Sequence, residues 1–256
     1  MNRQSVFFSF SGFQCKLQFA AQQLRKAIES SVSQHRIDPR QIIEIQGQVV
    51  EEKADAPTLY SWIRPHRIRD YTEDGRLYRV DLTRPSTIKK FQGLGRQAAA
   101  QMQAKVPTLN QVDRVVIFCY SQGALVAMES VKRLFWDKKH GWTKEILVFS
   151  FAGTTALPPS RLKSYAAKPL PPACVGQVGL TIVNFFDPRD EIIPPWHHDR
   201  TTREWSATGT KVINCPSEIA TAKPPFHGMY VPHVEHALVM LAGWGYRRWR
   251  PKLLAG

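Results

Sequence analysis

The sequence predicts an α/β fold in which helices cover both faces of a mostly parallel central sheet. Short apolar runs alternate with longer segments of helical periodicity, and turn residues separate the two kinds of segment. Several of the short runs are continuously apolar, as expected for strands that are buried on both faces. The chain has 256 residues, a length at which an α/β fold usually forms one domain. We therefore expect a single domain over residues 1–256.

The first half of the chain predicts two strands and two helices. Val6–Phe10 is a buried strand that ends in the turn signal Ser11-Gly12. Apolar residues recur at helical spacing from Leu17 to Val32, and Gln41–Val50 alternates as a second strand. Ile88–Val106 then predicts a helix.

Two stretches do not fit this alternation. Residues 54–86 contain β-forming segments at Tyr60–Ile68 and Arg76–Leu82, with the turn signal Glu73-Asp74-Gly75 between them. This pattern predicts a hairpin or an insertion. Residues 157–172 are rich in proline and predict a loop. The sequence shows no large cap domain, and only these two segments are candidates to cover a site.

The second half contains the clearest strand-to-helix unit in the chain. Val112–Tyr120 predicts a buried strand, and Ala124–Trp136 predicts an amphipathic helix. The remaining predicted elements are strands at Ile146–Phe151, Val178–Phe186 and Lys211–Asn214 and a final helix at His236–Trp249.

Ser121 lies at the turn between that strand and that helix, in the segment Cys119-Tyr120-Ser121-Gln122-Gly123. A serine on a sharp strand-to-helix turn is exposed above the sheet and needs small neighbours, which Gly123 provides. The start of a helix supplies unpaired backbone N–H groups and a partial positive charge. We therefore expect the N–H of Gln122 to stabilise an oxyanion that forms beside Ser121.

The segment YSQGA, preceded by VVIF and followed by an apolar helix, resembles the nucleophile elbow of the α/β-hydrolases. It is especially similar to the cutinase-like and small lipase branches, and the wider likeness runs from about residue 5 to residue 250. One departure is Cys119, where the family usually has glycine. The resemblance implies a serine hydrolase in which the acid and then the histidine follow Ser121 along the chain.

The resemblance places the acid after the predicted strand Val178–Phe186, where Asp187 and Asp190 are the candidates. Asp190 ranks first, because Asp190–Pro194 resembles the acid loop of the family. As an alternative, both are ordinary turn residues. His227, His233 and His236 follow the last strand, and we rank them in the order His236, His233, His227, because His236 opens the predicted final helix.

The resemblance also implies how these groups would act. His236 would take the proton of Ser121, and Asp190 would orient and stabilise the imidazole. The second oxyanion donor of the family comes from the loop after an early strand, which here makes the N–H of Phe13 the candidate. Ser11-Gly12 stands where the family has His-Gly.

We expect neither a metal nor another cofactor. His197 and His198 are adjacent, and neighbouring histidines rarely bind one metal with good geometry; we expect both at the surface near the acid loop. The four cysteines are too far apart for a metal knuckle. They are Cys15, Cys119, Cys174 and Cys215. Cys119 lies in an apolar run and is expected to be buried.

The chain carries 35 Lys and Arg against 21 Asp and Glu, a formal charge of +14. This charge favours an anionic partner such as a phospholipid surface, although solubility alone also explains it. Nucleic acid is not expected as a partner, because no RNP, helix-turn-helix or zinc motif occurs. The N-terminal segment lacks a signal peptide and no apolar run is long enough for a bilayer, so we expect a cytoplasmic protein unless export needs no such signal.

Three classes of function remain after this reading. The first, which we favour, is the cleavage of carboxylic esters or lipids by Ser121. The second is an acyltransferase or thioesterase on the same triad, which differs only in substrate or acceptor. The third is a non-catalytic scaffold that binds an anionic partner through its basic surface.

Overall fold

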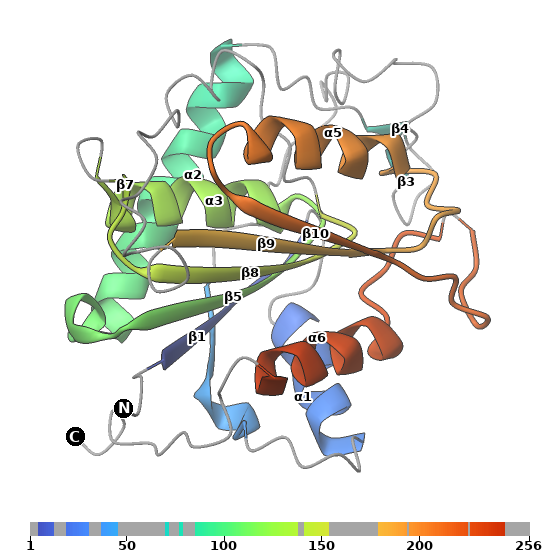
Figure 1. Ribbon diagram of the computed structural model, residues 1–256, viewed down its shortest axis with the longest axis horizontal. Coiled ribbons are helices and arrows are strands. Elements are labelled where there is room, and N and C mark those ends of the chain that lie inside the picture. The colour runs from blue at the N-terminus through green and yellow to red at the C-terminus, as the bar shows by residue number, and fades with distance from the viewer. Residues whose placement is uncertain are drawn as a thin grey trace.

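A parallel six-stranded sheet forms the centre of the protein in the order β10-β9-β8-β5-β1-β2 (Figure 1). Every pair of neighbouring strands in it is parallel, which confirms the predicted fold class. The computed structural model describes residues 5–12, 19–30, 37–45, 70–71, 77–78, 85–137, 141–153, 179–193, 195–224 and 226–243.

The elements of the described residues have the following bounds. The strands of the central sheet are β1 (Ser5–Phe10), β2 (Ile42–Glu44), β5 (Arg114–Tyr120), β8 (Glu145–Phe151), β9 (Gly179–Phe186) and β10 (Lys211–Pro216). The α-helices are α1 (Phe19–Ser30), α2 (Pro85–Lys105), α3 (Gly123–Phe135), α5 (Pro195–Ser206) and α6 (Val231–Gly243). Short 3-10 turns lie at η1 (Pro39–Gln41) and η2 (Leu109–Gln111), and two-residue strands pair as β3 (Asp70–Tyr71) with β4 (Leu77–Tyr78) and β6 (Trp136–Asp137) with β7 (Gly141–Trp142).

Helices cover both faces of the sheet, as the sequence predicts. Helices α1 and α6 pack on one face, and α2, α3 and α5 lie on the other (Figure 1). All residues of β5 are buried, because its side chains alternate between the two cores. Val115, Ile117 and Cys119 belong to the α2–α3 core, whereas Phe118 belongs to the α1–α6 core.

Aromatic rings from three adjacent strands build the α1–α6 core. The ring of Phe149 lies 5.4 Å from that of Phe118 and 6.3 Å from that of Phe185, measured between centroids. Phe151 stacks on Phe185 at 5.4 Å. Large aromatic side chains contribute much of the apolar area that a core buries, so these rings tie β5, β8 and β9 together beneath the carboxyl ends of the strands.

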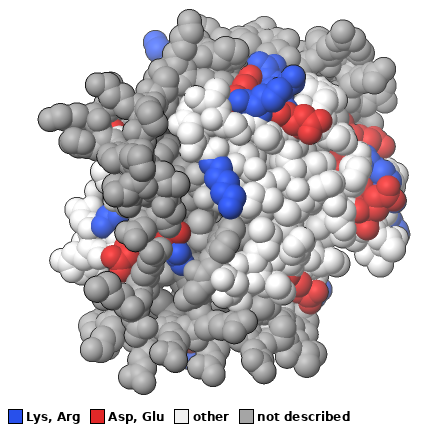
Figure 2. Space-filling model, viewed as in Figure 1, with Lys and Arg blue, Asp and Glu red and all other residues white. Residues whose placement is uncertain are grey.

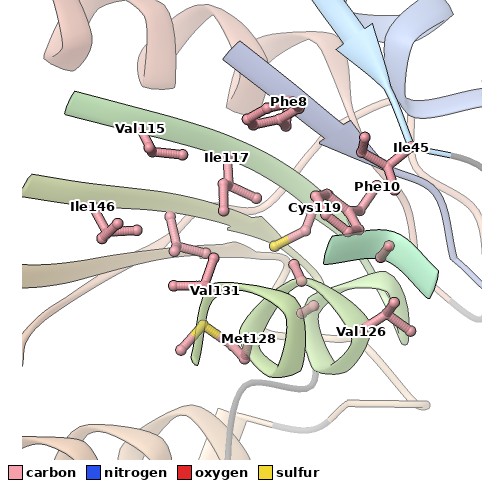
Figure 3. Close-up of a cluster of buried hydrophobic side chains, with 14 of the residues drawn as sticks. Phe8, Phe10, Ile45, Val115, Ile117, Cys119, Val126, Met128, Val131 and Ile146 are labelled. Carbon is pink, nitrogen blue, oxygen red and sulfur yellow. The ribbon is translucent and has the colours of Figure 1, made fainter. Parts of the chain in front are cut away.

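Cys119 is buried on the opposite face, as predicted. Its side chain points from β5 toward α3, into the cluster that contains Met128 and Val131 (Figure 3). Burial raises the pKa of its thiol to about 12, and its Sγ donates to the carbonyl of Phe149 over 3.6 Å. Cys119 is therefore a protonated core residue and not a reactive thiolate.

Most predicted elements are confirmed within a few residues, and α5 is the clear omission. Its buried face consists of His197, His198, Thr201 and Trp205. Three of these four residues are not counted as apolar, so the helical period of the face does not appear in a hydrophobic pattern. Pro195 at the first helical position is the start signal that the sequence does offer.

The predictions for residues 54–86 and for the final helix can be compared with the structure in part. Strands β3 and β4 pair antiparallel, Asp70 with Tyr78, inside residues 54–86, where the sequence predicts a hairpin or an insertion; the predicted segment Tyr60–Ile68 lies outside the described residues. Helix α6 starts at Val231, earlier than the predicted start at His236. The proline-rich stretch 157–172 lies outside the described residues. None of the helices in the described ranges is both long and apolar enough to span a bilayer.

We expect Phe149→Ala to lower the free energy of unfolding by about 3–5 kcal/mol, because it removes a ring that is 0% exposed from the contact between two others. Val239→Ala is the control, since Val239 is 54% exposed and surface substitutions usually change stability by less than about 0.5 kcal/mol. Urea denaturation measures both variants. A loss for Phe149→Ala no larger than that for Val239→Ala would contradict this description of the core.

Candidate functional site

Ser121 occupies a sharp turn between β5 and α3. Its φ angle is +50°, a left-handed conformation that is uncommon for residues other than glycine and that frequently marks functional sites. The N–H of Ser121 donates to the carbonyl of Phe151 over 3.1 Å, which continues the pairing of β5 with β8 by one residue. The turn therefore has the geometry of a nucleophile elbow, with the side chain at the carboxyl end of the sheet.

Two glycines allow the elbow to approach the end of β1. A Cβ atom on Gly123 would lie 2.4 Å from the carbonyl oxygen of Ser11, and one on Gly12 would lie 2.8 Å from the Cβ of Ser121. Backbone this close leaves no room for a side chain at either position. Cys119 stands where the family that the elbow resembles usually has glycine. Glycine is not required there, because the Cys119 side chain points away from the elbow into the core. The φ angle of Ser121 shows that the turn forms with cysteine at this position.

Asp190 lies in the turn after β9 with a fully buried carboxylate (0% exposed). Its Oδ1 accepts hydrogen bonds from the N–H groups of Ile192 at 2.8 Å and Ile193 at 2.9 Å. Its own N–H donates to the carbonyl of Asp187 over 2.9 Å. The backbone thus fixes the carboxylate and leaves Oδ2 for another partner.

That partner is His227, in the loop between β10 and α6. Its Nδ1 lies 2.8 Å from Asp190 Oδ2, and its Nε2 lies 2.9 Å from Ser121 Oγ. The hydroxyl of Tyr120 donates to the His227 carbonyl over 3.2 Å. The ring is only 7% exposed. One imidazole therefore connects the serine hydroxyl with a buried carboxylate.

The prediction that His236 contacts Ser121 is wrong. His236 lies inside α6, is exposed, and packs its ring edge against Phe185 at 5.4 Å. His233, ranked second, is buried in the same helix, and its Nε2 lies 3.3 Å from the carbonyl of Ser217. The structure brings His227, ranked third, to Ser121. The overlooked signal is Pro232, because proline is favoured in the first turn of a helix and places the start before His233.

Asp187, the alternative acid, has other partners. Its carboxylate accepts from Arg189 Nε at 2.9 Å and Nη2 at 2.6 Å and from the N–H of Ile219 at 3.0 Å. The guanidinium of Arg189 lowers the pKa of Asp187 to about 2. Within the described part of the chain, the Asp187 carboxylate forms no hydrogen bond with a histidine. Asp190 is the carboxylate beside His227.

The helix start beside Ser121 offers an anion-binding position. Gln122 is the residue that precedes α3, with φ −63° and ψ −19°. No backbone carbonyl within the described ranges accepts a hydrogen bond from its N–H, and the partial positive charge of the helix end lies there. Phe13, the predicted second donor, falls outside the described residues.

Glu44, which no sequence pattern indicates, anchors Ser11 directly after β1. Its carboxylate accepts from the hydroxyls of Ser9 at 2.5 Å and Ser11 at 2.9 Å. The Ser11 Oγ in turn accepts from the N–H of Ala20 in the first turn of α1, over 3.1 Å. Burial raises the pKa of Glu44. This network joins β1, β2 and α1 next to Gly12, at the edge of the site.

The expectation that His197 and His198 are surface residues is wrong, because both are 0% exposed on the inner face of α5. His198 stacks on Phe186 with ring centroids 3.8 Å apart. Burial lowers the pKa of His197 to about 3 and that of His198 well below its usual value, so both rings are neutral. Within the described ranges, no three His, Cys, Asp or Glu side chains are grouped to hold a metal ion.

Solved structures share this architecture at low sequence identity. The esterase PE8 is 14% identical with a TM-score of 0.51, and the likeness covers 94% of this chain and 93% of PE8. Arabidopsis thaliana SOBER1 is 11% identical with a TM-score of 0.51, and the likeness covers 94% of this chain and 99% of SOBER1. No protein-family profile matches the chain, and no curated protein matches its sequence significantly. At these identities the likeness establishes the fold, which is the α/β-hydrolase fold.

Gly123→Ala tests the close approach of the elbow to β1. The added Cβ would overlap the carbonyl of Ser11, and overpacking of this kind costs about 1–3 kcal/mol of unfolding free energy. Gly243→Ala is a matched control, because nothing lies within 4 Å of a Cβ at that helical position and alanine favours helix by up to about 1 kcal/mol. Equal stability of the two variants in urea would show that the elbow does not touch β1.

Stability should fall as the pH drops below about 6.5, because His197 and His198 have lower pKa values in the folded than in the unfolded protein. The unfolded chain then binds more protons, and each such histidine costs up to about 1.4 kcal/mol per pH unit until its folded-state pKa is reached. Urea denaturation at pH 7.5 and pH 5 in wild type and His198→Phe measures this. The variant should lose less stability between the two pH values, whereas exposed His236→Phe should behave as wild type.

Proposed function

We propose that this protein is a serine hydrolase that cleaves carboxylic esters through an acyl-enzyme, with Ser121 as nucleophile, His227 as general base and acid, and Asp190 as the carboxylate that orients the imidazole. The observation that carries the proposal is the single imidazole of His227, which has Ser121 Oγ at 2.9 Å on one nitrogen and Asp190 Oδ2 at 2.8 Å on the other. These distances are within the range that proton transfer requires.

The first step is acylation of the serine. When the Nδ1–H of His227 donates to Asp190, the lone pair on Nε2 faces the hydroxyl of Ser121. Nε2 takes the hydroxyl proton while Oγ forms a bond to the carbonyl carbon of the ester. The π electrons of the carbonyl group move onto the carbonyl oxygen, which becomes the oxyanion. The buried carboxylate of Asp190 stabilises the imidazolium that results.

The oxyanion of this intermediate would be stabilised by the start of α3. The backbone N–H of Gln122 follows Ser121 directly and lies at the positive end of the helix dipole. A donor of this kind contributes about 3–4 kcal/mol to the stability of the transition state. The N–H of Phe13 remains the predicted second donor.

The intermediate then collapses and the acyl-enzyme is hydrolysed. The imidazolium of His227 gives its proton to the alcohol oxygen as the carbon–oxygen bond breaks, which leaves the acyl group on Ser121. Water next attacks the acyl carbon while His227 removes one of its protons. The same proton returns to Ser121 Oγ as the carboxylic acid leaves, so the site regains its starting state.

The structure supports an ester substrate only through the chemistry of the site and through one similar fold. PE8, which shares the fold, is described as an esterase. Acyl transfer to another acceptor and thioester cleavage use the same three groups, and they differ only in what enters after acylation or leaves before it. Products formed in water with and without an added alcohol distinguish hydrolysis from transfer.

An anionic lipid surface as partner remains a prediction from the charge of the chain. On the face drawn in Figure 2, some Lys and Arg side chains of the described residues lie beside Asp or Glu, one near the centre of the view stands apart, and uncharged surface separates them. That face therefore adds no support for membrane binding, and the proposed function does not depend on it.

Labelling with a fluorophosphonate probe tests the proposed function. We expect wild type to be labelled at Ser121, Ser121→Ala not to be labelled, and His227→Gln to react about 10⁴-fold more slowly because the serine lacks its base. His236→Gln is the matched control: it removes a histidine from the adjacent helix, and its labelling rate should stay within about twofold of wild type, as for a surface substitution.

Peptide mapping of the labelled protein locates the adduct. Absence of labelling in folded wild-type protein would favour the non-catalytic scaffold and overturn the proposal. Loss of labelling in His236→Gln with labelling retained in His227→Gln would contradict the assignment of the histidine.

A further inference from the structure

We propose that Arg189 is a positioning residue that holds His227 in register with Asp190, acting through the ring of Phe226 and the peptide of Ile219. The inference rests on the proposed function, because it concerns the alignment of the general base. It deepens that function by assigning a role to a charged side chain of the acid turn that contacts the histidine segment at both Ile219 and Phe226.

Arg189 belongs to the same tight turn as the acid. The N–H groups of Arg189 and Asp190 both donate to Asp187, the first to Oδ1 at 2.9 Å and the second to the carbonyl at 2.9 Å. The position of Arg189 is therefore fixed relative to Asp190 by the backbone. A contact that the Arg189 side chain makes with a neighbouring segment therefore positions that segment relative to Asp190.

Asp187 and Arg189 form hydrogen bonds with both backbone polar groups of Ile219, its N–H and its carbonyl. The N–H of Ile219 donates to Asp187 Oδ2 over 3.0 Å, and Arg189 Nη2 donates to the carbonyl of Ile219 over 3.0 Å. Arg189 Nη2 also donates to Asp187 Oδ2 over 2.6 Å. Ile219 lies after β10, on the segment that leads to His227, so this clamp fixes where the histidine loop begins.

The second contact reaches the residue directly before the histidine. The Cζ of Arg189 lies 4.4 Å from the centre of the Phe226 ring, a distance at which a cation is attracted to the aromatic face. Phe226 has a φ angle of +57°, and a bulky residue keeps this conformation only where its surroundings impose it. The guanidinium over the ring is such a constraint, and the direction in which the chain enters His227 depends on it.

Two adjacent residues of one loop therefore hold two adjacent residues of the other. Asp190 contacts the imidazole of His227, and Arg189 contacts the ring of Phe226. The hydroxyl of Tyr120 holds the backbone carbonyl of His227, and Arg189 adds a contact to the residue directly before it. The side chain of Arg189 is 37% exposed, whereas the Asp187 carboxylate that it contacts is fully buried. Removal of Arg189 should therefore also lower stability, and the test has to separate this loss from an effect on alignment.

The test compares Arg189→Met and Arg189→Lys with wild type in fluorophosphonate labelling and in hydrolysis of p-nitrophenyl acetate. We expect Arg189→Met to lower the labelling rate and kcat about 10- to 100-fold with KM little changed, because the base is misplaced while the binding surface remains. Lysine keeps the charge but cannot form the forked contact, so Arg189→Lys should recover part of the rate. Arg200→Met, which removes a partly buried ion pair with Glu204 on α5, should stay within about twofold of wild type.

The pH profile separates positioning from folding. Contact with the Asp190 carboxylate favours the protonated imidazole, so a looser contact should move the acidic limb of kcat/KM to lower pH. Phe226→Leu is the variant in which to measure this shift, because Arg189→Met also removes a cation near the imidazole, which acts in the opposite direction. A purely structural role would reduce the amount of active protein and leave the limb in place. If Arg189→Met does not fold, Phe226→Leu tests the same contact, because it removes the ring and keeps an apolar side chain. Non-additive rate losses in the double variant would show that the two residues act together.

The outcomes distinguish this inference from the function on which it rests. No labelling of wild type at Ser121 overturns the proposed function. Labelling of wild type together with an unchanged rate and pH profile in folded Arg189→Met or Phe226→Leu overturns only the role of Arg189.

Discussion

The candidate site depends on the two hydrogen bonds of the His227 imidazole, because they join three segments that are distant in sequence: the turn after β5, the turn after β9 and the loop before α6. Its two ring nitrogens meet Ser121 after β5 and Asp190 after β9. A neutral imidazole has one donor and one acceptor, so a carboxylate on one nitrogen directs the lone pair of the other toward the hydroxyl. Each of the three groups is ordinary alone; the relay forms only where the carboxyl ends of the parallel strands bring them together.

The backbone around these three residues is constrained where neighbouring segments approach one another closely. The left-handed turn at Ser121 requires Gly123 to lie against the end of β1, and Gly12 leaves room for the serine itself. On the opposite side, Arg189 and Phe226 lie against each other directly beside the acid and the histidine. Strain at functional residues persists only when the surrounding structure over-determines them, and these close contacts supply that support from both sides.

The sequence predicts the sheet, its layers and the serine turn, because continuous apolar strands and a small-residue turn are local signals. The sequence does not predict the correct histidine, because the choice depends on where α6 begins and the apolar pattern does not show the start at Val231, next to Pro232. It does not predict helix α5 either, because the buried face of α5 contains His197 and His198, which a hydrophobic pattern treats as polar. Pro195 and Pro232 are local signals for the two helix starts, whereas the burial of the histidines is decided by tertiary packing, which local sequence does not encode.

The contact between His227 and Asp190 is tested most directly by the proton that they share. A hydrogen bond from Nδ1–H to a buried carboxylate should give a strongly downfield proton resonance in the NMR spectrum. We predict that this resonance is present in wild type and in His236→Gln and absent in His227→Gln and Asp190→Asn. A resonance that persists without His227, or one that disappears when His236 is replaced, would contradict the relay described above.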